Sequence, residues 1–321
     1  MARPALPKSF YDIRPLHTAL LILYAFSLFV FPSVASLLLL HAAVPLWVKV
    51  PLILTFATLA SFGLSICGYI GHEGGHICLH RNKYVSLALG ILCSFPISRQ
   101  FVLGFSASHW NHHGYTNEAN DPNLDIYKRF NTFWSRMLFS GAYASRRYAG
   151  YVRKMAKGQP LQFRYKLPFT TQELRCFAIL NLAVHYISRL CFFSLLFFFP
   201  LETAIGYFLP LVIFAFYNGV RPYIEHTETE QEEYKNSRTR SSWVWTLLEA
   251  GINFHQEHHL YPRVPMYRLR KLHYYLKEIG YFKPDQPNLD RGILSVFRHA
   301  FSNAALPVYS NPTVSRTAST S

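Results

Sequence analysis

Four apolar runs, each long enough to cross a bilayer, constrain the fold of this chain more than any other feature. They cover residues 16–40, 46–70, 174–199 and 203–220. A membrane-spanning helix needs about 17 to 25 predominantly apolar residues. The runs form two pairs, and each pair is joined by a turn of only a few residues. The sequence therefore predicts an all-α integral membrane protein whose four spans form two transmembrane hairpins.

The composition agrees with a membrane location. The 321 residues are 50% hydrophobic and only 15% charged, whereas soluble domains are about 25% charged. The net charge of +15 would suit nucleic acid, an anionic membrane surface or an acidic substrate. Because of the apolar runs we favour the membrane and expect no nucleic-acid partner. The 5 cysteines lack C-x-x-C spacing, so we expect free thiols and no disulfide framework.

Basic residues orient the two hairpins. The segment 71–173 between the second and third spans carries 13 Lys and Arg, whereas the opposite turns offer essentially Lys49 alone. By the positive-inside rule this segment and both termini are cytoplasmic. We divide the chain into a cytoplasmic N-terminal lead (1–15), a single membrane domain (16–305) with a cytoplasmic helical cap, and a disordered tail (306–321) rich in Ser, Thr, Pro and Asn.

A shorter apolar piece, residues 85–105, interrupts the large cytoplasmic segment. Its uncharged part is short, contains Pro96 and ends at Arg99. We predict an interfacial or re-entrant helix and no fifth span. The histidines that flank this piece support the same conclusion, because a crossing would place them on opposite sides of the membrane.

Histidines are concentrated in three five-residue windows. The chain has 15 His, and these windows hold eight of them, where fewer than one is expected by chance. The eight are His72, His76, His109, His112, His113, His255, His258 and His259. Spacings of i, i+3 and i+4 place imidazoles on one face of a helix. Clustered imidazoles in this arrangement are typical of metal ligands.

Eight imidazoles are too many for one zinc ion and suit two metal ions with about four ligands each. Imidazole binds iron, zinc, copper and nickel, so the ligand type does not choose the metal. We predict that three further residues, Glu73, Glu257 and His80, support the ligands without binding the ions. The sequence has no G-x-G-x-x-G, no P-loop and no haem-attachment motif, so electrons must come from a separate donor protein.

Two alternatives use the same residues differently. The segment His72–His76 fits H-E-x-x-H, the signature of a zinc protease with Glu73 as general base. That hypothesis leaves the second and third histidine windows without a role. A membrane metal transporter would carry its ligands within the spans, whereas these windows follow or flank them.

The order and spacing of the windows resemble the membrane-bound fatty acid desaturase family. The pattern is H-x3-H, then H-x2-H-H, then a second H-x2-H-H after the second hairpin. The segments His113–Asn117, with Asp121-Pro122 after it, and His259–Pro262 match as well, and the similarity runs from about 46 to 279. The resemblance implies two iron ions that activate O2, electrons from a ferredoxin or a cytochrome b5, and a fatty acyl or related lipid substrate. Hydroxylases, ketolases and oxidative decarboxylases share these motifs, so the reaction stays open.

Residues in the third span, in the fourth span and just after it extend this prediction. The segment Arg221–His226 resembles the Glu-His element of some sphingolipid and bacterial desaturases, and we predict His226 as a ninth ligand. Asn218 lies two helical turns before it and could hold a water bound to a metal. Within the third span, His185 and Arg189 are either a structural pair or a substrate contact.

Overall fold

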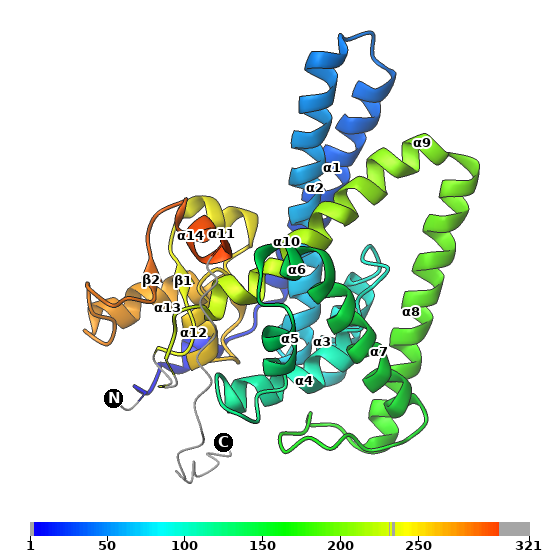
Figure 1. The fold of residues 1–321 in the computed structure, drawn as a ribbon. Helices are drawn as coiled ribbons and strands as arrows, with labels where there is room; N and C mark the ends of the chain where they lie inside the picture. Colours follow the sequence, from blue (N-terminus) through cyan, green and yellow to red (C-terminus); the bar gives the residue numbers. More distant parts are fainter. Residues whose placement is uncertain (1–2, 231, 233–234, 302–321) are drawn as a thin grey trace.

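The computed structural model describes residues 3–230, 232 and 235–301; the predicted tail 306–321 lies outside them. Two long helical hairpins dominate the fold (Figure 1). The first joins α1 (Pro15–His41) and α2 (Leu46–Gly75). The second joins α8 (Thr171–Phe198) to a run of α9 (Pro200–Thr203), the π-helical turn η3 (Ala204–Phe208) and α10 (Leu209–His226). Four helices, counting Pro200–His226 as one, are long and apolar enough to cross a membrane, as the sequence predicted.

The remaining elements form a helical cap at one end of the hairpins (Figure 1). They are η1 (Lys8–Tyr11), α3 (Lys83–Cys93), α4 (Val102–Tyr115), α5 (Leu124–Arg129), α6 (Phe133–Ser135), the π-helical η2 (Arg136–Ser140), α7 (Gly141–Ala156), α11 (Trp243–Leu248), α12 (His255–Leu260), α13 (Met266–Glu278) and α14 (Ser295–Phe301). Two-residue strands β1 (Thr239–Arg240) and β2 (Leu289–Asp290) pair in parallel.

Two predicted span boundaries were too short at the cap end. Helix α2 continues past residue 70 to Gly75, and α10 continues past residue 220 to His226. Both extensions carry polar residues. Residues 71–75 and 223–226 are buried inside the protein, and Arg221 and Pro222 are partly buried. The predicted turn at 200–202 is also helical. Helix α8 ends at Phe198, Phe199 has a non-helical conformation, and Pro200 begins α9.

The apolar piece 85–105 does not cross the membrane in one helix. It is divided between α3 and α4, and α3 has 11 residues, about 16 Å at the rise of an α-helix. Helix α3 lies directly against α2, where a Cβ added to Gly74 would come within 2.9 Å of Gly90 Cα. The Trp110 indole of α4 donates to Gly75 O at 3.0 Å, so the chain returns to the end of α2.

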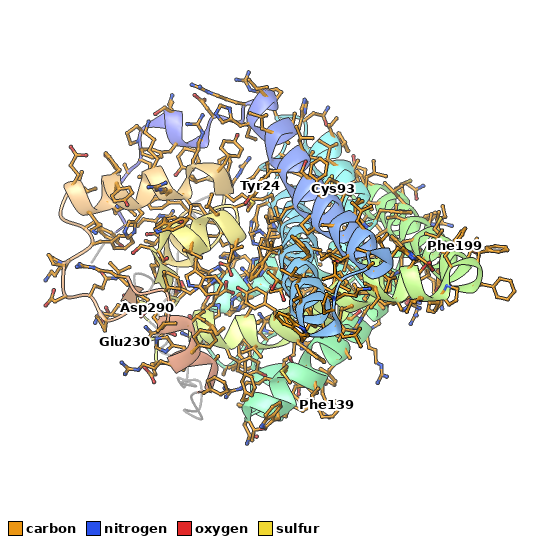
Figure 2. All side chains as sticks on the ribbon, turned by 90° about the horizontal axis from the view of Figure 1, so that it is seen from above. Tyr24, Cys93, Phe139, Phe199, Glu230 and Asp290 are labelled. Atoms are coloured by element: carbon orange, nitrogen blue, oxygen red, sulfur yellow. The ribbon has the colours of Figure 1, made fainter. Side chains whose placement is uncertain are left out.

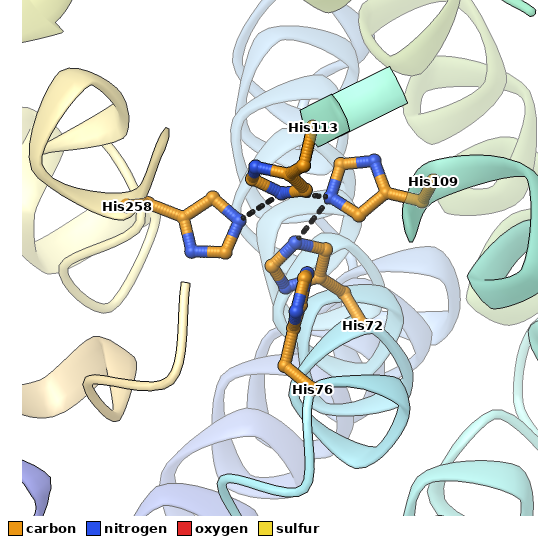
Figure 3. Close-up of side chains that lie close together, drawn as sticks. All are labelled: His72, His76, His109, His113 and His258. Atoms are coloured by element: carbon orange, nitrogen blue, oxygen red, sulfur yellow. Dashed lines mark hydrogen bonds between the residues drawn. The ribbon is translucent and has the colours of Figure 1, made fainter. Parts of the chain in front are cut away.

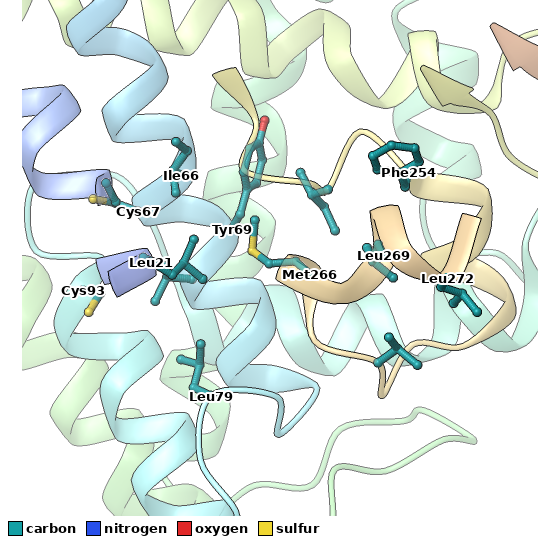
Figure 4. Packing of buried hydrophobic residues seen from close by; sticks show 14 of the residues in the cluster. Leu21, Ile66, Cys67, Tyr69, Leu79, Cys93, Phe254, Met266, Leu269 and Leu272 are labelled. Carbon is teal, nitrogen blue, oxygen red and sulfur yellow. The ribbon is translucent and has the colours of Figure 1, made fainter. Parts of the chain in front are cut away.

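The interior of the cap joins α2 to the helices near the C-terminal end. Tyr69 and Ile66 of α2 belong to one buried apolar cluster with Met266, Leu269 and Leu272 of α13 (Figure 4). The outward faces of α1 and α8 carry exposed Leu and Phe side chains, and Phe199 projects from the far end of the second hairpin (Figure 2). Large exposed apolar areas on long apolar helices are the surfaces that lipid covers.

His185 and Arg189, the polar pair in the third span, contact the segment that links α3 and α4. The Arg189 Nε donates to Ser98 O at 3.1 Å, in the link between α3 and α4. The His185 ring lies 4.2 Å from the Phe101 ring, centroid to centroid. Of the two alternatives for His185 and Arg189, these contacts favour the structural pair.

Backbone contact between α1 and α2 gives a prediction about stability. A Cβ at Gly63 would lie 2.3 Å from Phe29 N, so Gly63→Ala must push the two helices apart. We expect a loss of about 1–3 kcal/mol, as for other overpacked sites, measured as a lower melting temperature in detergent. Gly150→Ala in α7 is the control, because nothing lies within 4 Å of its added Cβ. An equal melting temperature for both variants would contradict the close contact.

Candidate metal centre

Four helices deliver histidines to one place inside the cap. The last turn of α2 carries His72, and His76 follows as its C-cap residue. Helix α4 carries the second histidine window and α12 the third, while His226 ends α10. The nine side chains are His72, His76, His109, His112, His113, His226, His255, His258 and His259; His113 is partly buried and the other eight are buried. The structure therefore brings together every histidine that the sequence predicted as a ligand.

The first group contains five of these imidazoles (Figure 3). They are His72, His76, His109, His113 and His258, and one ring nitrogen of each lies within 4.8 Å of the others. His109 Nε2 is 2.9 Å from His72 Nε2 and 3.0 Å from His113 Nε2. His76 Nε2 is buried and has no hydrogen-bond partner within the described residues, as expected of a nitrogen that serves a metal.

The second group lies next to the first. His112, His226 and His259 each offer a ring nitrogen within 4.8 Å of the other two. His255 joins them, because its Nε2 is 3.1 Å from His259 Nε2 and 3.4 Å from His226 Nε2. The rings of His113 and His259 connect the groups, with centroids 4.4 Å apart. The nine histidines thus divide into five and four.

The spacing of the nitrogens fits metal coordination. Imidazole nitrogens bind zinc at about 2.0–2.1 Å, so two ligands of one such ion lie at most about 4.2 Å apart. The shortest contacts within each group, 2.9 to 3.4 Å, fall inside that limit. Two ions, one in each group, would therefore use all nine imidazoles.

The protonation state of these histidines also suits metal binding. Burial lowers the pKa of the His76 imidazole to about 3. Burial likewise holds the pKa of each remaining cap histidine of the first group, His109, His113 and His258, well below the usual value. An imidazole whose folded-state pKa is lowered is neutral at pH 7, and a neutral ring has the lone pair that a metal requires.

Partners on the far side of three rings fix their orientation. Asp121 Oδ2 lies 2.8 Å from His112 Nδ1, and His226 Nδ1 donates to Asn236 O at 3.0 Å. His259 Nδ1 lies 3.3 Å from Thr116 Oγ1. Each contact turns the Nε2 atom toward the second group, as supporting partners of metal-bound histidines do. Asn236 was not predicted, because it lies in a loop with no motif.

The four residues predicted to support the ligands have different surroundings. Glu73 Oε1 lies 3.3 Å from His72 Nδ1, and its Oε2 accepts from Met266 N at 2.7 Å. Glu257 is buried and contacts His273 and Thr239. Asn218 lines a cavity together with His72 and His226.

His80, which we predicted to support the ligands, lies outside both histidine groups. Its Nδ1 accepts from Asn82 N at 3.0 Å in the turn before α3. Helix α2 ends at Gly75, and Ile77 adopts φ 60. The helix that carries the first histidine window therefore does not continue to His80.

A second cavity also borders His72 and is lined by aromatic rings. Its wall includes His72, Phe101, Phe105, Tyr148 and Phe214. An apolar, aromatic wall beside a metal site suits an alkyl chain better than a polar peptide. The protease hypothesis also leaves seven of the nine clustered histidines without a role.

Comparison with known families identifies the family of this protein. The family model described as fatty acid desaturase matches residues 45–285, three quarters of the chain. The chain belongs to the fatty acid desaturase family. The match contains all nine clustered histidines. This member of the desaturase family is thus an integral membrane oxidoreductase of lipid chains with a histidine centre suited to metal. A search of curated proteins found no match.

Proposed function

We propose that this desaturase-family protein is an O2-dependent enzyme that binds two iron ions and desaturates a fatty acyl or related lipid chain. The observation that carries the proposal is the division of nine imidazoles into two adjacent groups. Iron in these groups would supply activated O2 and remove hydrogen from an unactivated C–H bond. The family membership supports a lipid chain as the substrate.

The residues of the chain have three tasks in this proposal. The imidazoles hold the ions while staying neutral, which permits the iron to change oxidation state without a change in ligand protonation. The aromatic wall around Phe105 and Phe214 binds the alkyl chain beside His72 and excludes water. Asn218 lies on the shared wall of both cavities, where its amide can orient a water near the second group.

We propose that electrons arrive from a separate donor of ferredoxin or cytochrome b5 type. The net charge of +15 favours a donor with an acidic surface, since complementary charge speeds encounter. Faster turnover at low than at high ionic strength, with an acidic donor, is the expected behaviour.

We propose that the cap and both termini face the cytoplasm. Single cysteines placed at Lys83, Lys157 and Lys235, in a chain freed of its own cysteines, should react with an impermeant thiol reagent from one common side. A cysteine at Lys49, in the first turn of α2 at the other end of this helix, is the control and should react from the opposite side. Opposite accessibility of positions 83 and 157 would mean that 85–105 crosses the membrane.

Lipid profiling tests the reaction. The protein is expressed with a compatible electron donor in a host, and acyl chains and hydrocarbons are measured with and without O2. A new double bond that requires O2 supports desaturation. A new hydroxyl, a new carbonyl or a shortened terminal alkene would replace the proposal by a hydroxylase, a ketolase or an oxidative decarboxylase, respectively. No oxidised product from any lipid class would contradict the proposal.

A further inference from the structure

Glu225 lies at the edge of the second histidine group and was not predicted as part of the site. Its side chain is 3% exposed, and it directly precedes His226 at the end of α10. Glu225 Oε2 lies 3.5 Å from His255 Nε2. Glu225 also lines the cavity that His112, His226 and His255 share. A carboxylate oxygen is thus within ligand spacing of the His255 imidazole.

The two oxygens of this carboxylate face different partners. Arg221 Nη2 lies 2.7 Å from Glu225 Oε1, one helical turn away. The Arg221 guanidinium is itself held over the Tyr69 ring, 4.2 Å from the centroid, and Arg240 Nη2 lies 3.9 Å from the same Oε1. Positive charge therefore fixes Oε1, and Oε2 is left on the side of the histidines.

The number of imidazoles in each group indicates a role for Glu225 Oε2. The first group has five imidazoles and the second has four. We infer that Glu225 Oε2 is the fifth protein ligand of the metal ion in the second group. One ion then has five nitrogen donors, and the other has four nitrogens and one oxygen. Imidazoles combined with a carboxylate are a familiar donor set for non-haem iron. This inference rests on the proposed two-iron function.

A purely structural role is the competing explanation. Glu225 belongs to a buried network in which Arg221 and Arg240 face Glu225 and Glu249. The charges in this network balance without a metal. Glu249 provides a matched control, because it is equally buried but contacts Arg240 and Tyr217.

The experiment compares iron content of Glu225→Gln and Glu249→Gln after anaerobic loading with ferrous iron. Glutamine keeps the size of the side chain and can still place an oxygen beside Arg221, but it is a poor ligand. We expect Glu225→Gln to hold about one iron where the unsubstituted protein holds two. Its Mössbauer spectrum should lose the same doublet that His226→Ala loses. Glu249→Gln should melt at a lower temperature and still hold two irons.

Rescue by a small carboxylate covers the case in which Glu225→Gln does not fold. Glu225→Ala leaves room for acetate beside His255, and added acetate should restore the second iron and its doublet. Two irons and an unchanged spectrum in Glu225→Gln would overturn the inference and leave the proposed function intact. Loss of the second iron from Glu225→Ala without recovery in acetate would also overturn it. Fewer than two irons in the unsubstituted protein would instead contradict the proposed function.

Discussion

His109→Ala is expected to abolish product formation and to empty the first group of its metal. The His109 imidazole is central to that group, with its Nε2 2.9 Å from His72 Nε2 and 3.0 Å from His113 Nε2. Loss of a residue that only supports a ligand costs about 10–100-fold in affinity or activity. Loss of a central ligand should exceed the upper end of that range.

The measurement is product formation together with iron per chain in detergent-purified protein. His80→Ala is the matched control, because His80 lies between the first two histidine windows but outside both metal groups. We expect this control to keep its iron and most of its activity. Activity within about tenfold of normal in folded His109→Ala would refute the ligand role.

His226→Ala is expected to lose about half of the iron and all of the product. His226 Nε2 lies 3.2 Å from His112 Nε2 and 3.4 Å from His255 Nε2. Its other nitrogen is held by Asn236 O, so the ring cannot turn away without breaking a buried hydrogen bond. The first group contains no atom of His226 and should keep its ion.

An outer histidine controls for the substitution itself. His41 lies at the far end of α1 and pairs with Glu202, so His41→Ala should retain both irons. Thermal melting separates loss of metal from loss of fold. A full complement of iron with normal activity in His226→Ala would reduce His226 to a structural residue.

The helical positions of the histidines explain how far the sequence could predict the centre. The spacings i, i+3 and i+4 place His109, His112 and His113 on one face of α4, as the sequence analysis expected. The structure nevertheless divides them, with His109 and His113 in the first group and His112 in the second. In α12, His255 and His259 share one group and His258 joins the other. The sequence predicted that these imidazoles cluster, but it predicted neither their division within each helix nor how the helices pair across the cap.

Other features depend on tertiary contacts that no local pattern encodes. The fourth span was predicted to end at residue 220, because Arg221 and Glu225 look like the start of a polar loop. The helix continues because these two charges pair with each other, and the cap buries Glu225 and partly covers Arg221. Asp121 lay in a recognised motif, but its contact with His112 depends on the turn after α4.

The central claim is that nine imidazoles hold two iron ions. Metal analysis of purified protein, loaded anaerobically with ferrous iron, tests this claim most directly when it is combined with Mössbauer spectroscopy. We predict two irons per chain in two nitrogen-rich environments. A single tightly bound zinc, with proteolysis that is lost in Glu73→Gln, would contradict it.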